Sequence, residues 1–204
     1  MIQARGRHTT RFRAVPVHPP VAYADPMPAR PSLGGSYRFL TEDQLLAQCD
    51  QDHYRASGPG GQKRNKTSNA VRLRHRPTGF IVTATESRSQ KENRLYAIRR
   101  MRLKLATDLR EPIDPLRFEP PDWFLSIRRQ ERIEASHRHE YYPAAGGLVL
   151  DLMKALGGNP ATVAINLGVS TSSVIKLLES DPHFWTAANT IRADLGMTPL
   201  TRRR

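Results

Sequence analysis

The stretch that decides the fold is residues 70–109, which read AVRLRHRPTGFIVTATESRSQKENRLYAIRRMRLKLATDL. In its first part, apolar and polar residues alternate with a period of two on both sides of the turn Pro77-Thr78-Gly79, and this alternation predicts a β-hairpin. One face of the hairpin is apolar. The other face of its first strand carries Arg72, Arg74 and Arg76.

The second part of this stretch predicts a long helix. Ser89 and Glu92 have the spacing of a capping box that opens a helix over about 89–109, and prolines at 112 and 115 end it. Its apolar residues fall at helical spacing and are expected to lie against the hairpin: Leu95, Ile98, Met101, Leu105 and Leu109. With a short helix over 42–49, whose following residues 52–56 run into a glycine-rich loop, residues 36–110 are predicted to form a small α+β domain.

The remaining chain divides into three further parts. Residues 1–35 contain six prolines and predict a disordered leader. Residues 111–147 predict a linker and a charged helix over about 123–139, capped by Asp122, with Pro143 and Gly146-Gly147 interrupting the chain after it. Residues 148–204 predict an all-α module with a short basic tail. The module contains the spacing of a helix-turn-helix, carried by Ala164, Gly168, Val174 and Leu177.

Positive charge is concentrated in one segment. The formal net charge is +13, and residues 55–110 hold 15 Lys and Arg against 3 Asp and Glu. Such a segment favours binding to a phosphate backbone, because each neutralised phosphate releases condensed counterions. The single cysteine, Cys49, excludes an internal disulfide, and no residues have zinc-ligand spacing, so we expect no metal and no cofactor. We also expect a monomer that does not enter a membrane.

The segment Ser57-Gly58-Pro59-Gly60-Gly61-Gln62 is the candidate for chemistry. Three glycines and a proline favour an exposed loop with accessible backbone amides. A glutamine side chain is uncharged near neutral pH and cannot act as a general base, whereas backbone N–H groups can stabilise a developing oxyanion. The sequence therefore predicts a loop that supplies hydrogen-bond donors and no titrating group.

Four blocks in order resemble the catalytic domain of class I bacterial and organellar peptide-chain release factors. They are residues 57–62, then Asn65-Lys66-Thr67-Ser68-Asn69-Ala70-Val71, then Pro77-Thr78-Gly79, then Ser87-Arg88-Ser89-Gln90-Lys91-Glu92-Asn93. The resemblance spans about residues 53–109. It implies that Gly60, Gly61 and Gln62 form a catalytic loop that enters the peptidyl-transferase centre of the large ribosomal subunit. The Gln62 N–H would stabilise the transition state as water attacks the peptidyl-tRNA ester, and its side chain would help to select water.

The resemblance also implies partners. Ribosomal RNA and the P-site peptidyl-tRNA would be bound by basic residues near the loop, for which the candidates by charge and position are Arg55, Lys63, Arg64, Lys66, Arg72, Arg74, Arg76, Arg88 and Lys91. In bacterial relatives the glutamine is often methylated, so Gln62 is a candidate substrate of a glutamine methyltransferase. Lys63 and Arg64 depart from the family pattern, which usually has His or a similar residue followed by Val or Ile.

A codon-reading release factor needs a decoding domain, and only 54 residues precede Arg55 here. We therefore expect a factor that releases chains without reading a stop codon, as in the rescue of stalled ribosomes. The expected location is the bacterial cytoplasm, with the mitochondrion as the alternative. Two other functions stay open: a catalytically silent ribosome-binding protein, and a helix-turn-helix regulator that binds nucleic acid. The partner of the C-terminal module is not identified by the sequence.

Overall fold

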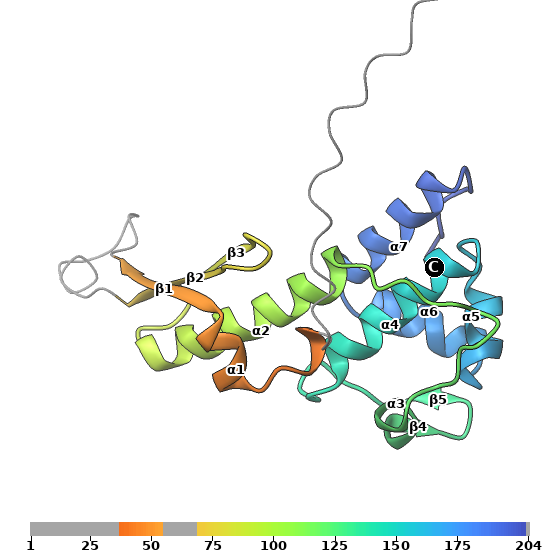
Figure 1. The fold of residues 1–204 in the computed structure, drawn as a ribbon, viewed down its shortest axis with the longest axis horizontal. Helices are drawn as coiled ribbons and strands as arrows, with labels where there is room; N and C mark the ends of the chain where they lie inside the picture. The colour runs from red at the N-terminus through yellow and green to blue at the C-terminus, as the bar shows by residue number, and fades with distance from the viewer. Residues whose placement is uncertain (1–36, 55–68, 203–204) are drawn as a thin grey trace, which may run out of the picture. The chain divides into compact units, whose positions relative to one another are not determined.

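The computed structural model describes residues 37–54 and 69–202, and the predictions for residues 1–36, 55–68 and 203–204 fall outside that part. Residues Gly35–Arg204 form one compact unit. After two short helices, its elements are a small sheet with a long helix, then one further helix, a short hairpin and four more helices (Figure 1). This arrangement confirms the predicted α+β class, with a helical C-terminal part.

The described part of the chain begins with a short 3-10 helix, Tyr37–Phe39, and helix α1, Glu42–Ala47. Thr41 caps α1 in a reciprocal capping box with Gln44, which satisfies donors that a helix start leaves free. The predicted helix over 42–49 is thus two residues too long, because the next strand begins at Cys49.

The sheet is antiparallel, in the order β1-β2-β3. The predicted hairpin is confirmed as β2, Ala70–His75, and β3, Ile81–Ala84. Strand β1, Cys49–Tyr54, was missed, since residues 52–56 were expected to lead straight into the loop. Its sequence CDQDHY is poor in residues that favour strands, and the strand forms because β2 offers it a partner edge.

Helix α2, Gln90–Asp108, covers the apolar face of this sheet. Ile98, Met101 and Leu105 are buried as predicted, together with Val71 and Leu73 of β2. Leu95 was predicted to pack against the hairpin, but it is 38% exposed. Its expected place is taken by Asn93 and Ala97, both fully buried. The stripe that faces the sheet is therefore rotated by about two residues at the start of the helix.

The segment after α2 differs from the prediction. Helix α3, Asp122–Ile127, is followed by a two-stranded hairpin of β4, Arg128–Arg129, and β5, Arg132–Ile133. The predicted helix over 123–139 is therefore wrong beyond Ile127, because Gln130 turns the chain with a φ of 52°. Asp122 is also not the cap, since Pro121 holds that position and Asp122 is the first helical residue.

The predicted interruption at Pro143 and Gly146-Gly147 is wrong, because all three lie inside helix α4, Tyr142–Ala155. Pro143 is in the first turn, where its missing N–H costs nothing. Gly146 lies under the ring of Phe184, and a Cβ at that position would overlap the ring. This glycine therefore serves close helix packing.

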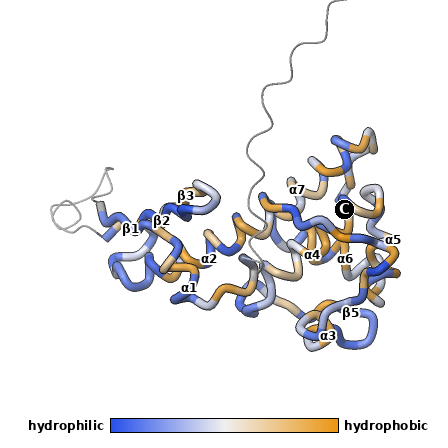
Figure 2. Tube along the Cα trace, in the orientation of Figure 1, coloured by the Kyte–Doolittle hydropathy of each residue, from blue (hydrophilic) through white to orange (hydrophobic). Residues whose placement is uncertain are grey.

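Helices α5, Pro160–Leu167, α6, Thr171–Glu179, and α7, Pro182–Asp194, complete the chain. They share a core with α4 that includes Leu150, Leu167, Leu178 and Phe184. Figure 2 shows hydrophobic stretches along α4, α5 and α6, whereas β1 is largely hydrophilic. Within the part that the structure describes, no single helix is long and apolar enough to cross a membrane, and only the bent α5–α6 pair meets the length and composition criteria jointly.

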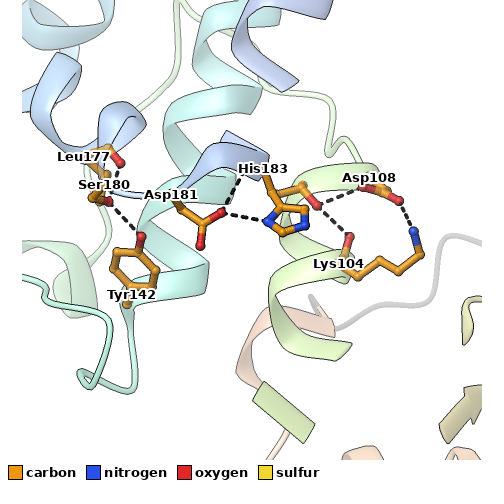
Figure 3. Close-up of polar contacts among 8 residues, drawn as sticks. Lys104, Asp108, Tyr142, Leu177, Ser180, Asp181 and His183 are labelled. Carbon is orange, nitrogen blue, oxygen red and sulfur yellow. Dashed lines mark hydrogen bonds and ion pairs between the residues drawn. The ribbon is translucent and has the colours of Figure 1, made fainter. Parts of the chain in front are cut away.

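Polar contacts fasten the end of α6 to α4 and cap the start of α7 (Figure 3). The Tyr142 hydroxyl donates to Ser180 Oγ at 2.7 Å, and Ser180 donates in turn to the Leu177 carbonyl at 2.7 Å. Burial raises the pKa of Tyr142 to about 12. Asp181 caps α7 by accepting from the His183 backbone N–H and from its ring Nδ1, both at 2.8 Å.

Candidate functional site

The connection that carries Gly60, Gly61 and Gln62 starts and ends at one point of the sheet. Strands β1 and β2 are registered from the pair Cys49–His75 to the pair Tyr54–Ala70. Residues 55–69 therefore leave and return beside a single strand pair. Gly60, Gly61 and Gln62, with Arg55, Lys63, Arg64 and Lys66, lie outside the described residues.

Asn69, the residue just before β2, is held by two amide hydrogen bonds. Its Nδ2 donates to the Arg88 carbonyl at 2.7 Å, and its own carbonyl accepts from Asn93 Nδ2 at 2.7 Å. Asn93 lies in the first turn of α2 and is fully buried. The second and fourth sequence blocks, which are about 20 residues apart in the chain, therefore meet at the place where the connection re-enters the sheet.

The same buried amide also orders the segment that precedes α2. Asn93 Nδ2 donates to the Ser87 carbonyl at 2.8 Å, and its Oδ1 accepts from the Ser87 N–H at 2.9 Å. Ser87 Oγ donates to Glu92 and accepts from the Ser89 N–H. Ser89 Oγ accepts from the Glu92 N–H at 3.4 Å, so half of the predicted capping box is present while the Glu92 carboxylate binds Ser87.

The arginine row of β2 lies on the exposed face of the sheet, as predicted. Arg72 pairs with Asp52 at 2.7 Å, and Arg76 pairs with Asp50 at 3.0 Å. Both pairs are about half exposed, so each contributes at most about 1 kcal/mol and leaves the guanidinium groups accessible to solvent. Arg74 is exposed between them, and no ion pair is seen for it among the described residues.

Arg88 and Lys91, the two remaining described candidates, are both exposed. The Arg88 carbonyl holds Asn69, so its side chain projects from the segment that anchors the re-entry point. The structure thus brings Arg88 and Lys91 to the end of α2 that contacts Asn69. Sequence reasoning missed Asn69 and Asn93 as positioning residues. A polar residue at a core-facing helical position was the signal for Asn93.

His75 is a buried titratable group of the sheet. It is fully buried at the end of β2, where its ring nitrogens contact Thr78 Oγ1 at 2.8 Å and Gln48 Oε1 at 3.0 Å. Burial, helped by the charge of Arg76, lowers the pKa of His75 from its usual 6.5. The imidazole is therefore neutral near pH 7 and has a structural role.

The predicted helix-turn-helix has the expected geometry. Helices α5 and α6 are bent by 111° across the turn 168–170, within the usual range for this motif. Gly168 adopts the left-handed conformation with a φ of 65°. Ala164, Val174 and Leu177 are buried at the contact.

The face of α6 that would enter a DNA groove is partly covered. The β4–β5 hairpin lies against it, with the Glu131 carbonyl accepting from the Ser170 N–H at 2.8 Å and the Ile133 N–H donating to Ser173 Oγ at 2.9 Å. In DNA-binding helix-turn-helix proteins, the N-terminal residues of the second helix contact base edges. The hairpin covers only the side of α6 that carries Ser170 and Ser173, and Thr171 and Ser172 stay exposed.

Comparisons with known proteins find matches for the part of the chain that contains the three-stranded sheet and α2. Residues 46–116 match the RF-1 domain model. Peptide chain release factor 2 of Kineococcus radiotolerans is 37% identical over 107 residues, which cover 52% of this chain and 25% of that protein. The release factor 2 of Lactiplantibacillus plantarum is 41% identical over 102 residues, covering 50% and 23%.

Release factor 1 of Caulobacter vibrioides is 47% identical over 68 residues, covering 33% of this chain and 19% of that protein. The chain thus spans about a quarter or less of the length of the curated relatives it matches. The matched residues 46–116 contain the whole sheet, helix α2, and the Asn69 and Asn93 contacts. The chain therefore contains an RF-1 domain, and over that domain it is similar to peptide chain release factors 1 and 2.

Proposed function

We propose that the protein hydrolyses the ester of ribosome-bound peptidyl-tRNA and so releases the nascent chain. The observation that carries this proposal is the RF-1 match over residues 46–116, which includes Gly60-Gly61-Gln62 intact. Water attacks the ester carbonyl, the bond to the 3′-terminal adenosine breaks, and the peptide leaves as a free acid. The oxygen released on the tRNA takes up a proton.

Gly60, Gly61 and Gln62 have distinct roles in this proposal. The Gln62 backbone N–H donates to the oxyanion that forms on the carbonyl, and its side chain selects water as the nucleophile. The two glycines permit a backbone conformation that side chains would forbid. Because these residues supply no base, proton transfer belongs to the ribosomal RNA and the tRNA ribose.

The basic residues bind RNA in this proposal. Their common feature is a position on the connection, on the exposed sheet face, or at the start of α2: Arg55, Lys63, Arg64, Lys66, Arg72, Arg74, Arg76, Arg88 and Lys91. Phosphate contacts of this kind supply affinity without reading sequence. The large ribosomal subunit is therefore the principal partner, in the cytoplasm or in the mitochondrion, and Gln62 is a candidate for methylation.

We further propose that release does not depend on a stop codon. Among the described residues ahead of Arg55, the 3-10 helix, α1 and β1 all belong to the small α+β domain itself. Two tripeptides fit the Pro-x-Thr pattern of codon-reading factors, at 160–162 and 199–201. The first lies in the opening turn of α5, and the second contains Leu200, which packs on the helical core. Neither placement suits a codon-reading tip.

The test is release of labelled peptide from purified ribosomes with an empty A site, and from ribosomes with a stop codon in the A site. We expect the wild type to release peptide equally in both cases and Gln62→Ala to lose release. Release only with a stop codon would contradict codon independence. Binding without release would favour a silent ribosome-binding protein, the alternative to which the Lys63-Arg64 departure points.

A further inference from the structure

We propose that Asn93 is a positioning residue for peptide release, acting through Asn69; this inference rests on the function proposed above. Asn93 does not touch the reacting atoms. Its fully buried carboxamide fixes the backbone at the point where the connection bearing Gln62 re-enters strand β2.

The chemistry of the position selects asparagine. A carboxamide offers two N–H donors and a carbonyl acceptor. At Asn93 the donors reach the carbonyls of Asn69 and Ser87, and the acceptor receives the Ser87 N–H, at 2.7–2.9 Å. The reversed amide would place an oxygen against two carbonyl oxygens, so the orientation is set by the contacts themselves. An aspartate would place a charge there, and an alanine would leave buried carbonyls without a donor.

Asn69 is held from a second side. Its side chain donates to the Arg88 carbonyl, while its own carbonyl accepts from Asn93. Arg88 and Asn93 flank the start of α2, and Asn93 also holds Ser87. The residue seven positions after Gln62 is therefore fixed to the rigid helix by two amides that act in concert.

We expect a substitution at Asn93 to lower the turnover rate of peptide release and to leave ribosome affinity unchanged. An oxyanion donor must be placed accurately, and a displacement of about 1 Å can cost roughly 100-fold in rate. Ribosome affinity depends on the basic side chains, whose number Asn93 does not alter. If Asn93 had only a structural role, its substitution would lower the amount of folded protein. The turnover rate and ribosome binding would then change only to the extent that folding fails.

The experiment compares Asn93→Asp, which is nearly isosteric, with Ser89→Ala as the matched control. Ser89→Ala removes the N-cap of the same helix and leaves the Asn69 contacts in place. At a temperature where circular dichroism shows both variants folded, we expect Asn93→Asp to lower kcat for release roughly 10- to 100-fold. Its half-saturating ribosome concentration should stay within about twofold of wild type, as should both parameters of Ser89→Ala. Equal kcat losses in the two variants would overturn the proposal.

Asn69→Ala supplies a second arm. If both amides act on the same backbone point, the double variant Asn69→Ala/Asn93→Asp is no slower than the slower single variant. If the kcat losses of the two single variants multiply in the double variant, the two amides do not act through the same backbone point. Should the wild type release no peptide, the proposed function fails on its own, and amide resonances decide the inference instead. Asn93→Asp must then shift the amides of residues 60–70 while Ser89→Ala leaves them unchanged, and unshifted amides would overturn it.

Discussion

Asp151 Oδ1 lies 3.0 Å from Arg110 Nη1, and the Asp151 side chain is completely shielded from solvent. Asp151 lies within α4, and Arg110 lies two residues beyond the end of α2, so the pair joins the RF-1 domain to the C-terminal helices. Asp151 also accepts from the Glu111 N–H at 3.2 Å. Removing one member of a buried ion pair costs stability.

We therefore expect Asp151→Ala to lower the free energy of unfolding by about 3–5 kcal/mol, because it removes a fully buried carboxylate from the Arg110 side chain, which is only 16% exposed. Urea denaturation measures the change. Asp114→Ala is the control, since Asp114 contacts the exposed Arg117 at 3.8 Å and should change stability by less than about 0.5 kcal/mol. Similar losses in both variants would show that burial does not govern the Asp151 pair.

Acid should destabilise the fold through His75. Burial lowers the pKa of His75 in the folded protein, so the unfolded chain binds the proton more readily. Stability is unaffected by this group above about pH 6.5, falls as the pH drops below that value, and levels off below the folded pKa. His75→Gln should flatten that part of the stability curve, measured by urea denaturation between pH 8 and 5. An unchanged slope would assign the acid sensitivity to other groups.

Gly146→Ala should destabilise the protein, although alanine ordinarily favours a helix over glycine by about 1 kcal/mol. The added methyl would overlap the Phe184 ring, so a net loss of about 1–3 kcal/mol is expected. Phe184→Leu should cost less in the Gly146→Ala background than in the wild type, because the smaller side chain relieves the overlap. Thermal denaturation of the four proteins gives the coupling energy, and additive losses would be inconsistent with the overlap.

Arg74→Ala should weaken ribosome binding and reduce the dependence of affinity on salt by about one phosphate contact. Arg74 is exposed between two ion pairs on the sheet face, so its charge is available to a phosphate. Binding of ribosomes at several salt concentrations measures the slope. Arg117→Ala, which removes a guanidinium that is 89% exposed outside the basic segment, should leave the slope unchanged. An equal effect of both changes would point to net charge alone.

How far the sequence predicts the structure depends on where the signal lies. The β2–β3 hairpin and α2 follow from local periodicity and turn residues, and the α5–α6 turn follows from Gly168. Strand β1 has no such pattern, because its stability comes from a partner strand that is distant in sequence. The charged run 128–132 satisfies helical pairing equally well, and only contacts with α6 decide for a hairpin.

The candidate site shows the same division. The arginine row was predictable, since alternation places its members on one face. Its pairing with Asp50 and Asp52 was not, because the register of β1 was unknown. The buried Asn93 shifts the helix stripe away from Leu95, since its amide is satisfied only by carbonyls from two separate segments. Such a requirement is set by tertiary structure and leaves only a weak trace in composition.

The length of helix α2 also sets the distance between the contacts at its two ends. Asn93 lies in its first turn and Arg110 lies two residues beyond its end, and its 19 residues correspond to a length of about 28 Å. Adding one residue within it would lengthen this span by about 1.5 Å and turn everything beyond the insertion by about 100°. The length of α2 and its rotation per residue therefore fix how α4 and α7 are oriented relative to Asn69. A chain of this architecture can vary its C-terminal helices freely only if it keeps the residue count of α2 constant.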